Sequence, residues 1–592
     1  MNCRKAFIIE TAAPVPDEWT AGYAQHLFLR KGGSIVKKKV ISSMLAVSML
    51  AVTLFGCGSQ PGSGEATGSA GGGESQPVQS SDTAGGDDSQ GGQAQASQYQ
   101  TTYGSKMFDN VTITVELFDR SNAPDGSTIT ENKWTEYVNQ EMNKVGINVE
   151  FVPVPRWDEV TKMQSMVAGQ TAPDLTLTYT YAYAEDYFNQ GGIWDLSEFI
   201  DGADQALNMK EYLGQEVLDI GRNADGKLYG IVAKRATTAK SNICIRKDWL
   251  DDLNLSMPTT PDELYNVVEQ MTKNNPDGRN DVLGMIIWNA WNLRMAFSKI
   301  AGDPTAVEIA STEDAIQDYY DEGMRDYYRF MNKMYNNGLL NQEYYTMSED
   351  NFKSYIVTGA AASFEYAVNG SVDVMRGSLL KTLQENDSSA DIVSIPPLKN
   401  VNDGKQYSAA YASGGLIAFC PLTADAETVE ACMTYLDWMC TKEGGHVLYH
   451  GFEGEHYDYD SNGVPVVKDA EYNTKDKDWI RADIFLVGNQ GYFATVDDFN
   501  ACTAKEAPGY EDHVVANYEN AMIGTLNHDS TYTSPSTPEL ITDINLVKDE
   551  YQVKCITCPM DQFEQTYDEY MEELKNAGVQ TIIDERTEHA GN

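Results

Sequence analysis

Aromatic residues beside charged or amide side chains recur along this chain, and this combination suits the binding of a sugar. Aromatic faces stack on the CH-rich surface of a sugar ring, and the planar groups of Asp, Asn, Glu and Arg pair with its hydroxyls. Trp288 and Trp291, for example, follow an apolar run and fall on one side of a turn or helix. The candidate ligand contacts are Asp119, Arg120, Trp157, Tyr179, Tyr181, Trp288, Trp291, Glu365, Tyr366, Asn369, Tyr411, Trp479 and Arg481.

Other chemistries remain as alternatives for these residues. A peptide or amino-acid ligand would need charges for both of its termini, and any single tryptophan or tyrosine also fits a place in the core. The sequence has no Gly-x-Ser-x-Gly, no His-Glu-x-x-His and no Gly-x-x-x-x-Gly-Lys-Ser/Thr, so no nucleophile, zinc or phosphate motif indicates an enzyme. We expect no catalytic residue and no cofactor. Because carboxylates are abundant, a secreted glycoside hydrolase stays open, as does a surface glycan adhesin.

The sequence contains only incomplete motifs for a calcium site and for a cysteine-bound zinc site. Asp277 and Asp281 lie in a loop rich in Asp and Asn that partly matches a calcium loop, but it lacks the downstream glutamate and favours a plain Asx/Gly turn. Cys555 and Cys558 have CxxC spacing without a second pair, which favours a local disulfide or buried thiols over a zinc site. We therefore predict no metal.

Alternating strand and helix patterns open the body of the chain. Apolar alternation predicts strands at 110–118, 147–154 and 173–179, and helical spacing predicts helices at 131–144 and 156–168. Repeated strand–helix units imply an α/β fold with a parallel sheet, which places ligands at the carboxyl ends of its strands. These ends are Asp119-Arg120, Pro155-Arg156-Trp157 and Tyr179-Thr180-Tyr181.

A lysine triplet and an apolar run precede this body. Lys37-Lys38-Lys39 is followed by the apolar residues 40–55, a run too short to span a bilayer, and then by Gly56-Cys57. Leu-x-Gly-Cys resembles the lipobox of bacterial lipoproteins, which implies a signal peptide at 37–57 and acyl chains such as palmitate on Cys57. We expect translation to start at Val36, so that 1–36 is an artefact of gene prediction. Residues 58–105 are rich in Gly, Ser and Gln and predict a disordered tether.

Four further motifs resemble one family when taken in order. They are Pro173-Asp174-Leu175, Gly226-Lys227-Leu228-Tyr229-Gly230-Ile231, Ile245-Arg246-Lys247-Asp248-Trp249-Leu250 and Pro258-Thr259-Thr260-Pro261-Asp262-Glu263-Leu264. Together with the lipobox they resemble the extracellular solute-binding proteins of ABC importers, in the large lipoprotein branch of the sugar-type cluster. Gly451-Phe452-Glu453-Gly454-Glu455-His456-Tyr457 is similar to a loop of the same branch.

This resemblance implies two α/β lobes within 106–592, with crossings near 235–245 and 360–370 and a periplasmic-binding-protein-like cleft between the lobes. It implies a monomer that captures a carbohydrate, most plausibly an oligosaccharide, and passes it to membrane permeases. The 592 residues carry 43 basic and 88 acidic side chains, which argues against nucleic acid and against an anionic membrane surface as partners. We expect the protein on the extracellular face of the cytoplasmic membrane, held there only by lipid.

Overall fold

The computed structural model describes residues 100–592 apart from 224, 289, 311–313, 412–413, 489–495, 528–531, 533 and 591–592. The described residues all belong to one unit, Gly92–Asn592. Segment 1–36, the leader 37–57 with Cys57, and the tether up to residue 99 lie outside the described residues. In the part of the chain that is described, no helix has both the length and the apolar content of a membrane span.

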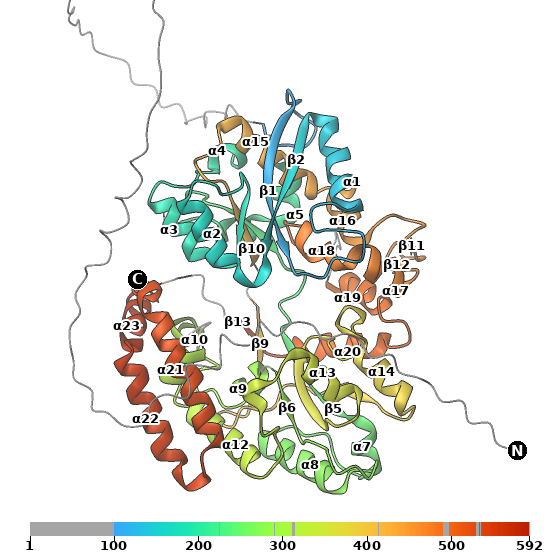
Figure 1. Cartoon of the computed structure of the whole chain (residues 1–592), viewed down its shortest axis with the longest axis vertical. Helices are drawn as coiled ribbons and strands as arrows, with labels where there is room; N and C mark the ends of the chain where they lie inside the picture. The colour runs from blue at the N-terminus through green and yellow to red at the C-terminus, as the bar shows by residue number, and fades with distance from the viewer. Residues whose placement is uncertain are drawn as a thin grey trace, which may run out of the picture. The chain divides into compact units, whose positions relative to one another are not determined.

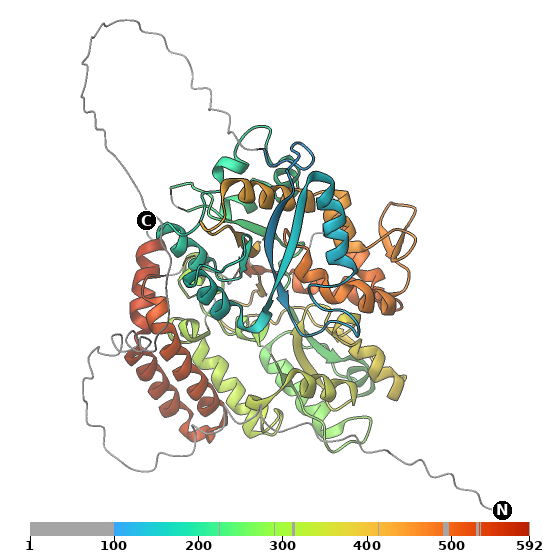
Figure 2. The same ribbon diagram turned by 45° about the horizontal axis from the view of Figure 1, so that its top comes forward.

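The first sheet is largely parallel, as the strand–helix pattern predicts. It contains β1 (Val111–Asp119), β2 (Ile147–Pro155), β3 (Thr176–Thr178), β4 (Ile231–Lys234) and β10 (Gly414–Phe419). β1 pairs in parallel with β2, a parallel bridge links β1 to the start of β3, and β10 lies antiparallel between β3 and β4. The strands β1 to β4 therefore share one direction, and their carboxyl ends lie at one edge. Figure 2 shows β1 and β2 as neighbouring strands with α1 (Lys133–Met142) alongside.

Local sequence explains why α1 begins and ends where it does. The Asn132 side chain accepts hydrogen bonds from the backbone of Trp134 and Thr135, and the Thr135 hydroxyl accepts one from the Asn132 N–H, which completes a capping box. Trp134, Val138 and Met142 form the buried face. A short 3₁₀ turn continues to Gly146, whose φ of 80° is the left-handed conformation that glycine tolerates at a helix end.

Helices from distant parts of the chain complete the first lobe, which we define as the first sheet and the elements packed on it. The segments 447–488 and 496–505 belong here, because α18 contacts β1. The helices of this lobe are α1, α2 (Glu159–Ala168), α3 (Tyr181–Asn189), α4 (Ser197–Ile200), α5 (Leu207–Leu213), α6 (Gln215–Ile220), α15 (Ala426–Met439), α16 (Val447–His450), α17 (Ala470–Asn473), α18 (Trp479–Ile484) and α19 (Val496–Lys505). A small hairpin of β11 (Tyr457–Tyr459) and β12 (Pro465–Val467) precedes α17.

The second sheet has the strand order β6–β7–β5–β8 and defines the second lobe. Its strands are β5 (Ser241–Arg246), β6 (Ile286–Ile287), β7 (Ser363–Ala367) and β8 (Ile392–Ser394). β5 runs antiparallel to both β7 and β8. Alternate residues of β5 face different cores: Ile243 and Ile245 belong to the core beneath the C-terminal helices, and Cys244 to the larger core that the first lobe also enters.

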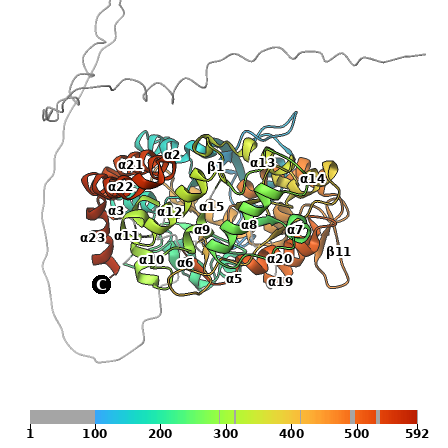
Figure 3. The same cartoon turned by 90° about the horizontal axis from the view of Figure 1, so that it is seen from below.

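The helices of the second lobe include a C-terminal group of three. Figure 1 shows α21, α22 and α23 side by side, and Figure 3 shows α21 and α22 near α12, in agreement with their contacts. The helices are α7 (Lys247–Asp252), α8 (Pro261–Asn274), α9 (Trp291–Met295), α10 (Pro304–Ala310), α11 (Asp314–Tyr320), α12 (Met324–Asn336), α13 (Glu349–Val357), α14 (Leu379–Asn386), α20 (Glu511–Ala521), α21 (Thr537–Thr557), α22 (Phe563–Asn576) and α23 (Val579–Ala590).

The connections between the two sheets differ in part from the expected crossings. Residues 235–240 link β4 of the first sheet to β5 of the second, within the expected region 235–245. The segment 360–370 instead contains β7, which pairs with β5 and β6 inside the second sheet. The chain returns between β9 (Ser408–Ala410), which pairs with β13 (Thr525–Asn527), and β10 of the first sheet. The sheet to which β7 belongs is set by its pairing with β5 and β6, which lie far away in the sequence. The local residue pattern of 360–370 carries no information on these partners.

The end of the expected tether is part of the folded body. Thr101 is fully buried, and its hydroxyl donates to the Phe199 carbonyl. The Tyr103 N–H donates to Asp437 Oδ2 at 2.8 Å, and Lys106 forms an ion pair with Glu430 at 2.6 Å. Both carboxylates belong to α15. The body therefore begins by residue 100, earlier than the expected tether boundary at 105.

Candidate functional site

A cavity of about 400 Å³ lies where the strands of the first sheet end. One part of its wall comes from the edge of this sheet, and a second part comes from the loop 368–376 that follows β7 of the second lobe. The third part comes from residues within 449–488 and 499–518, on elements from α16 to α20. The polar lining residues are Tyr179, Lys234, Arg235, Asn369, Asp373, Arg376, Tyr449, Thr474, Asp478, Arg481, Thr503, Glu506 and Tyr518. Three of the predicted ligand contacts, Tyr179, Asn369 and Arg481, line this cavity.

A stack of aromatic rings and an arginine stands at the ends of β1, β2 and β3. The rings of Phe118 and Tyr179 stack with centroids 5.9 Å apart, and the Arg156 guanidinium lies 4.2 Å from the Tyr179 centroid. Trp157 is the most solvent-exposed aromatic residue of this group, at 81%. An exposed indole beside a stacked arginine offers both a flat apolar face and hydrogen-bond donors to a ligand.

A second arginine–tyrosine pair stands at the end of β4. The Arg235 guanidinium lies 4.4 Å from the Tyr411 ring centroid, and its Nε donates to the Gly414 carbonyl at 2.9 Å. The Lys240 ammonium lies 4.6 Å from the Trp291 ring and 5.0 Å from the Tyr411 ring. The predicted contacts Trp291 and Tyr411 are thus held next to cations on the segment that links the two sheets.

Asn369 is the most unusual side chain of the cavity wall. Its φ of 61° places it in the left-handed region, which is uncommon for a residue other than glycine. Only 5% of the residue is exposed, and neither atom of its side-chain amide has a hydrogen-bond partner among the described residues. The Tyr518 hydroxyl lies beside this amide and the contact works to lower the pKa of Tyr518, although burial is the larger effect and raises that pKa; the contact falls short of hydrogen-bonding geometry. Strain and an unsatisfied buried amide at a cavity wall both point to ligand binding.

Arg481 forms the floor of the cavity with several acidic groups. Its Nη1 lies 2.9 Å from Glu506 Oε1 and 3.5 Å from Asp478 Oδ1, and its guanidinium lies 4.8 Å from the Tyr449 ring centroid. Burial alone would lower the pKa of Arg481, but the charges of Glu506 and Asp478 outweigh it and raise that pKa. Neighbouring Lys477 is buried against Asp478, and burial lowers its pKa. This network keeps Arg481 charged and fixed in position.

Several predicted contacts make internal interactions instead of facing the cavity. Glu365 is fully buried and accepts hydrogen bonds from the backbone N–H groups of Asn292 (2.7 Å) and Leu293 (3.2 Å) and from the Ser241 hydroxyl (2.7 Å). It thereby caps the start of α9, and burial raises the pKa of Glu365 to about 7. The buried Tyr366 donates its hydroxyl to Glu349, and burial together with that carboxylate raises the pKa of Tyr366 to about 12.

The remaining predicted contacts are each bound or packed against another residue of the protein. Asp119 accepts a hydrogen bond from the Ser121 N–H at 2.8 Å, and Arg120 is bound to Asp483. The Tyr181 hydroxyl donates to the Gly415 carbonyl at 2.5 Å. The buried Trp479 donates its indole N–H to the Asp476 carbonyl at 3.2 Å. Trp288 remains partly exposed and packs on Phe352, with ring centroids 6.3 Å apart.

Sequence reasoning missed the two arginines that stack on tyrosines, Arg156 and Arg235. Arg156 was visible as the residue directly after a predicted strand, between Pro155 and Trp157. Arg235 follows β4 in the same way. A search for every cation within a residue or two of a strand's carboxyl end would have found both.

The two candidate calcium ligands are engaged by arginines. Both oxygens of Asp281 accept hydrogen bonds from Arg279, at 2.9 and 2.7 Å. Asp277 Oδ1 accepts from the Trp249 indole at 3.2 Å, and its Oδ2 lies 3.7 Å from Arg246. The Asn275 side chain also closes the loop through the backbone of Arg279. These contacts form an Asx/Gly turn in which guanidinium groups take the positions beside the carboxylates. The seven cysteines from Cys244 to Cys558 are free thiols, and all but Cys558 are buried.

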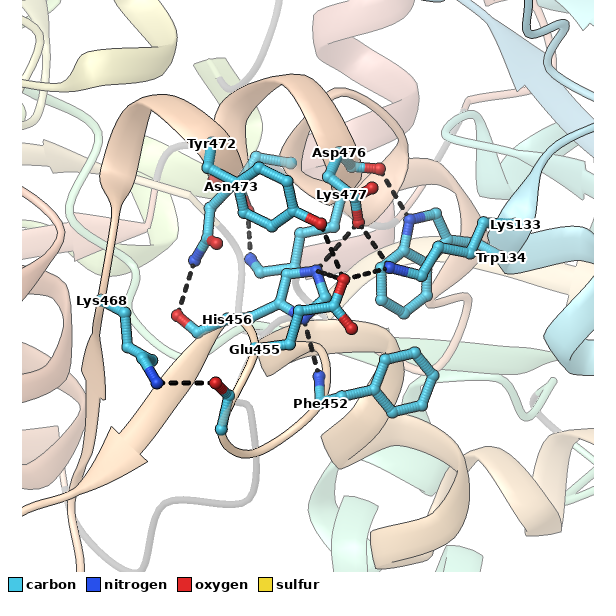
Figure 4. Close-up of polar contacts among 12 residues, drawn as sticks. Lys133, Trp134, Phe452, Glu455, His456, Lys468, Tyr472, Asn473, Asp476 and Lys477 are labelled. Atoms are coloured by element: carbon cyan, nitrogen blue, oxygen red, sulfur yellow. Dashed lines mark hydrogen bonds and ion pairs between the residues drawn. The ribbon is translucent and has the colours of Figure 1, made fainter.

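Glu455, His456 and Asp476 bring three potential metal-ligand atoms within 4.8 Å of one another. Figure 4 shows the Lys133 ammonium between the two carboxylates, 2.7 Å from Glu455 Oε1 and 3.0 Å from Asp476 Oδ2. His456 Nδ1 accepts the Phe452 N–H at 3.0 Å, so its proton is on Nε2, which lies 2.8 Å from Asp476. The cation of this cluster is a lysine side chain, and the imidazole lone pair is already used.

Comparisons with known proteins place this geometry in context. The model of the bacterial extracellular solute-binding protein family matches residues 136–450. Two curated relatives from Bacillus subtilis are each 25% identical. The polygalacturonan/rhamnogalacturonan-binding protein YtcQ matches over 304 residues, 49% of this chain and 56% of that protein. The lipoprotein LipO matches over 286 residues, 45% of this chain and 53% of that protein. The chain thus spans about half the length of these relatives.

Solved structures show the same fold over most of the chain. Alginate-binding protein AlgQ2, solved without calcium ion, superposes with a TM-score of 0.58 at 16% identity and covers 84% of this chain and 100% of its own. An HMO-binding solute-binding protein from Bifidobacterium longum infantis gives 0.58 at 14% identity, covering 81% and 98%. At these identities the likeness concerns the fold, and it confirms the predicted two-lobed, periplasmic-binding-protein-like α/β architecture.

Proposed function

This chain belongs to the bacterial extracellular solute-binding protein family, and from that premise we propose that it is the lipid-anchored capture subunit of an ABC importer for an oligosaccharide. The family is one of binding proteins, so capture without turnover replaces the hydrolase alternative. The observation that carries the proposal is the cavity at the strand ends, with the unsatisfied Asn369 amide in its wall.

The cavity wall supports a mechanism of capture that uses both lobes. Tyr179 and Arg235 come from the first sheet, and Asn369 comes from the loop after β7 of the second. A ligand that stacks on the tyrosine and pairs its hydroxyls with Asn369 contacts both lobes at once. Such a ligand stabilises the conformation in which the lobes are closest, and hinge closure around ligands is a common binding motion. The closed form then docks on permease subunits in the membrane.

The ligands of similar proteins support a carbohydrate. YtcQ is named for binding polygalacturonan and rhamnogalacturonan, and AlgQ2 for binding alginate. The Streptococcus pneumoniae protein FusA, with a TM-score of 0.56 at 15% identity, was solved in complex with kestose. Sugar rings also match the exposed Trp157 and the stacked Tyr179, because their CH-rich faces are flat and weakly polar.

A thermal-shift and calorimetric screen of the exported chain, from residue 58 onward, tests the capture proposal. The ligands are oligosaccharide series, amino acids and peptides. Binding of one oligosaccharide series, with the sugar recovered intact, is the expected result, since a ligand bound only by the folded state raises Tm by mass action. Binding of peptides alone would overturn the carbohydrate assignment, and conversion of the sugar would overturn capture without turnover.

The proposed anchor is tested separately in the native host. LipO, a relative that carries the name lipoprotein, supports acylation of Cys57. Wild-type protein should incorporate an alkyne-labelled palmitate and sediment with membranes, because two or more acyl chains make anchoring stable. Cys57→Ser should lose the label and the membrane association. A labelled Cys57→Ser protein would contradict acylation at this cysteine.

A further inference from the structure

The arginines of this acid-rich chain generally pair with carboxylates, and two of those in the described structure do not: Arg235, which lines the ligand cavity, and Arg156, which lies against the cavity residue Tyr179. Those with ion pairs among the described residues include Arg120, Arg222, Arg246, Arg279, Arg294, Arg325, Arg329, Arg376 and Arg481. Arg156 makes neither an ion pair nor a hydrogen bond within the described part of the chain, and its Nε is buried without a partner. Among the residues that the structure describes, Arg235 makes one hydrogen bond, to the Gly414 carbonyl, and no ion pair. With 88 acidic residues available in the chain, this lack of partners is informative.

Two acidic groups close to Arg156 form no ion pair with it among the described residues. Glu159 and Asp483 are close enough for Arg156 to lower their pKa values, although burial is the largest influence on each and raises both. Glu159 Oε1 accepts a hydrogen bond from the Tyr179 N–H at 3.3 Å. Both oxygens of Asp483 are held by Arg120, at 2.7 and 2.9 Å. The charge of Arg156 is therefore placed among carboxylates without being bound by one.

Both arginines stand at the same edge of the first sheet. Arg156 directly follows β2 and Arg235 directly follows β4, and these strands point in the same direction. Each guanidinium stacks on a tyrosine ring, at 4.2 Å for Arg156 on Tyr179 and 4.4 Å for Arg235 on Tyr411. Stacking fixes the plane of a guanidinium and leaves its N–H edge for an in-plane acceptor. The N–H edges of both guanidinium groups are thus oriented to bind planar anions.

We propose that the captured oligosaccharide carries carboxylate groups, as a uronic-acid oligomer does, and that Arg156 and Arg235 bind those carboxylates. This proposal rests on the proposed function of sugar capture and names its substrate class. A carboxylate matches the two parallel N–H donors of a guanidinium, which a hydroxyl does not. The neighbouring Trp157 then stacks on the sugar ring, and the Asn369 amide pairs with hydroxyls. The arginines distinguish acidic from neutral sugars, while the aromatic and amide groups bind both.

The test compares an acid with its own neutral ester. The ligands are oligogalacturonides of defined length and the same oligomers with every carboxylate methyl-esterified, measured by calorimetry on the exported chain. Wild-type protein should bind the acid about 10- to 100-fold more tightly than the ester, as expected for hydrogen bonds to a charged group. Arg156→Gln and Arg235→Gln should each lose most of that preference while keeping the affinity for the ester. A purely structural role would weaken both ligands equally.

A matched control and three further outcomes keep the proposals separate. Arg222 lies outside the cavity and pairs with Asp201 and Asp219, so Arg222→Gln should leave the preference for the acid unchanged. If neutral oligosaccharides bind as tightly as the acid and the arginine variants change nothing, carboxylate recognition is overturned and capture stands. If no sugar of either class binds, the capture proposal itself falls. If glutamate oligomers compete with the same dependence on Arg156, the saccharide class is overturned.

Discussion

Arg120 holds Asp483 through two parallel contacts, Nε to Oδ2 at 2.7 Å and Nη2 to Oδ1 at 2.9 Å. Arg120 follows β1, and Asp483 lies in α18, so the pair joins the edge of the first sheet to a helix far along the chain. Only 1% of the Asp483 side chain is exposed. Loss of the Arg120 side chain would leave a buried carboxylate without its hydrogen-bonded cation.

Arg120→Ala should therefore lower the free energy of unfolding by about 3 kcal/mol, because breaking a buried pair from one side costs more than the pair contributes. Chemical denaturation measures this effect. The double variant Arg120→Met/Asp483→Leu should recover most of the loss, since neither charge remains. A wild-type unfolding free energy together with lost ligand affinity in Arg120→Ala would instead make Arg120 a direct ligand contact.

Asn369→Gly should separate binding from folding. Glycine accepts the left-handed φ of 61° without strain, and the gain is partly offset by the extra freedom of glycine in the unfolded chain. We expect an unfolding free energy within about 1 kcal/mol of wild type and an affinity for the captured sugar that falls about 10-fold with the lost amide. Asn254→Gly is the matched control, because Asn254 also has a positive φ, of 51°, and is exposed outside the cavity. Unchanged affinity in Asn369→Gly would remove Asn369 from the site.

Glu365 should make stability depend on pH. Burial raises its pKa from 4.5 to about 7 in the folded state. Between those values the folded state keeps a proton that the unfolded state has released, so stability is lost as pH rises through this window. The expected contribution is about 3 kcal/mol. Denaturation at a series of pH values should show a shallower decline for Glu365→Gln than for wild type, whereas the exposed variant Glu131→Gln keeps the wild-type slope. Equal slopes would show that Glu365 is ionised in the folded protein throughout.

Lys133 should stabilise the cluster of Figure 4 without any metal. Its ammonium contacts both Glu455 and Asp476, but the lysine is partly exposed, so Lys133→Met should cost about 1 kcal/mol. Lys144→Met is the control, since Lys144 pairs only with Glu141 of the preceding turn and is more exposed. Adding a chelator or a divalent cation should leave the wild-type Tm unchanged. A rise in Tm with added cation would mean that the carboxylates bind metal in preference to the lysine.

The parts of the fold that local sequence controls are those that it predicts best. The strands at 110–118 and 147–154 appear as β1 and β2. Within the motif 258–264, α8 begins at Pro261, and Thr260 caps it by accepting the Glu263 N–H at 3.2 Å. Apolar alternation and capping depend on neighbours within a few residues. Sheet membership depends on partners hundreds of residues away, which is why the pattern of 360–370 does not reveal that β7 stays in the second sheet.

For the candidate site, too, some features follow from local sequence and others depend on distant residues. Position at a strand end directs attention to Tyr179, which lines the cavity, because the direction of a parallel strand follows from the strand–helix repeat. Whether a polar side chain faces the cavity depends on its tertiary partners. Glu365 accepts hydrogen bonds from backbone N–H groups at the start of α9, and Arg120 is bound to Asp483. Arg156 and Arg235, in contrast, have no carboxylate partner in the described structure. Residue type and spacing do not distinguish these cases.

The attachment of residues 100–106 to α15 has a mechanical consequence. Thr101, Tyr103 and Lys106 hold the entering chain against the first lobe through buried or charged contacts. A pull on the chain that precedes residue 100 is therefore borne by α15 and the first sheet, and the load does not pass through residues 235–240, which connect the first sheet to the second. Closure of the second lobe, as proposed above, therefore leaves the segment 100–106 in its place on the first lobe, and the ligand does not have to break these contacts to bring the lobes together.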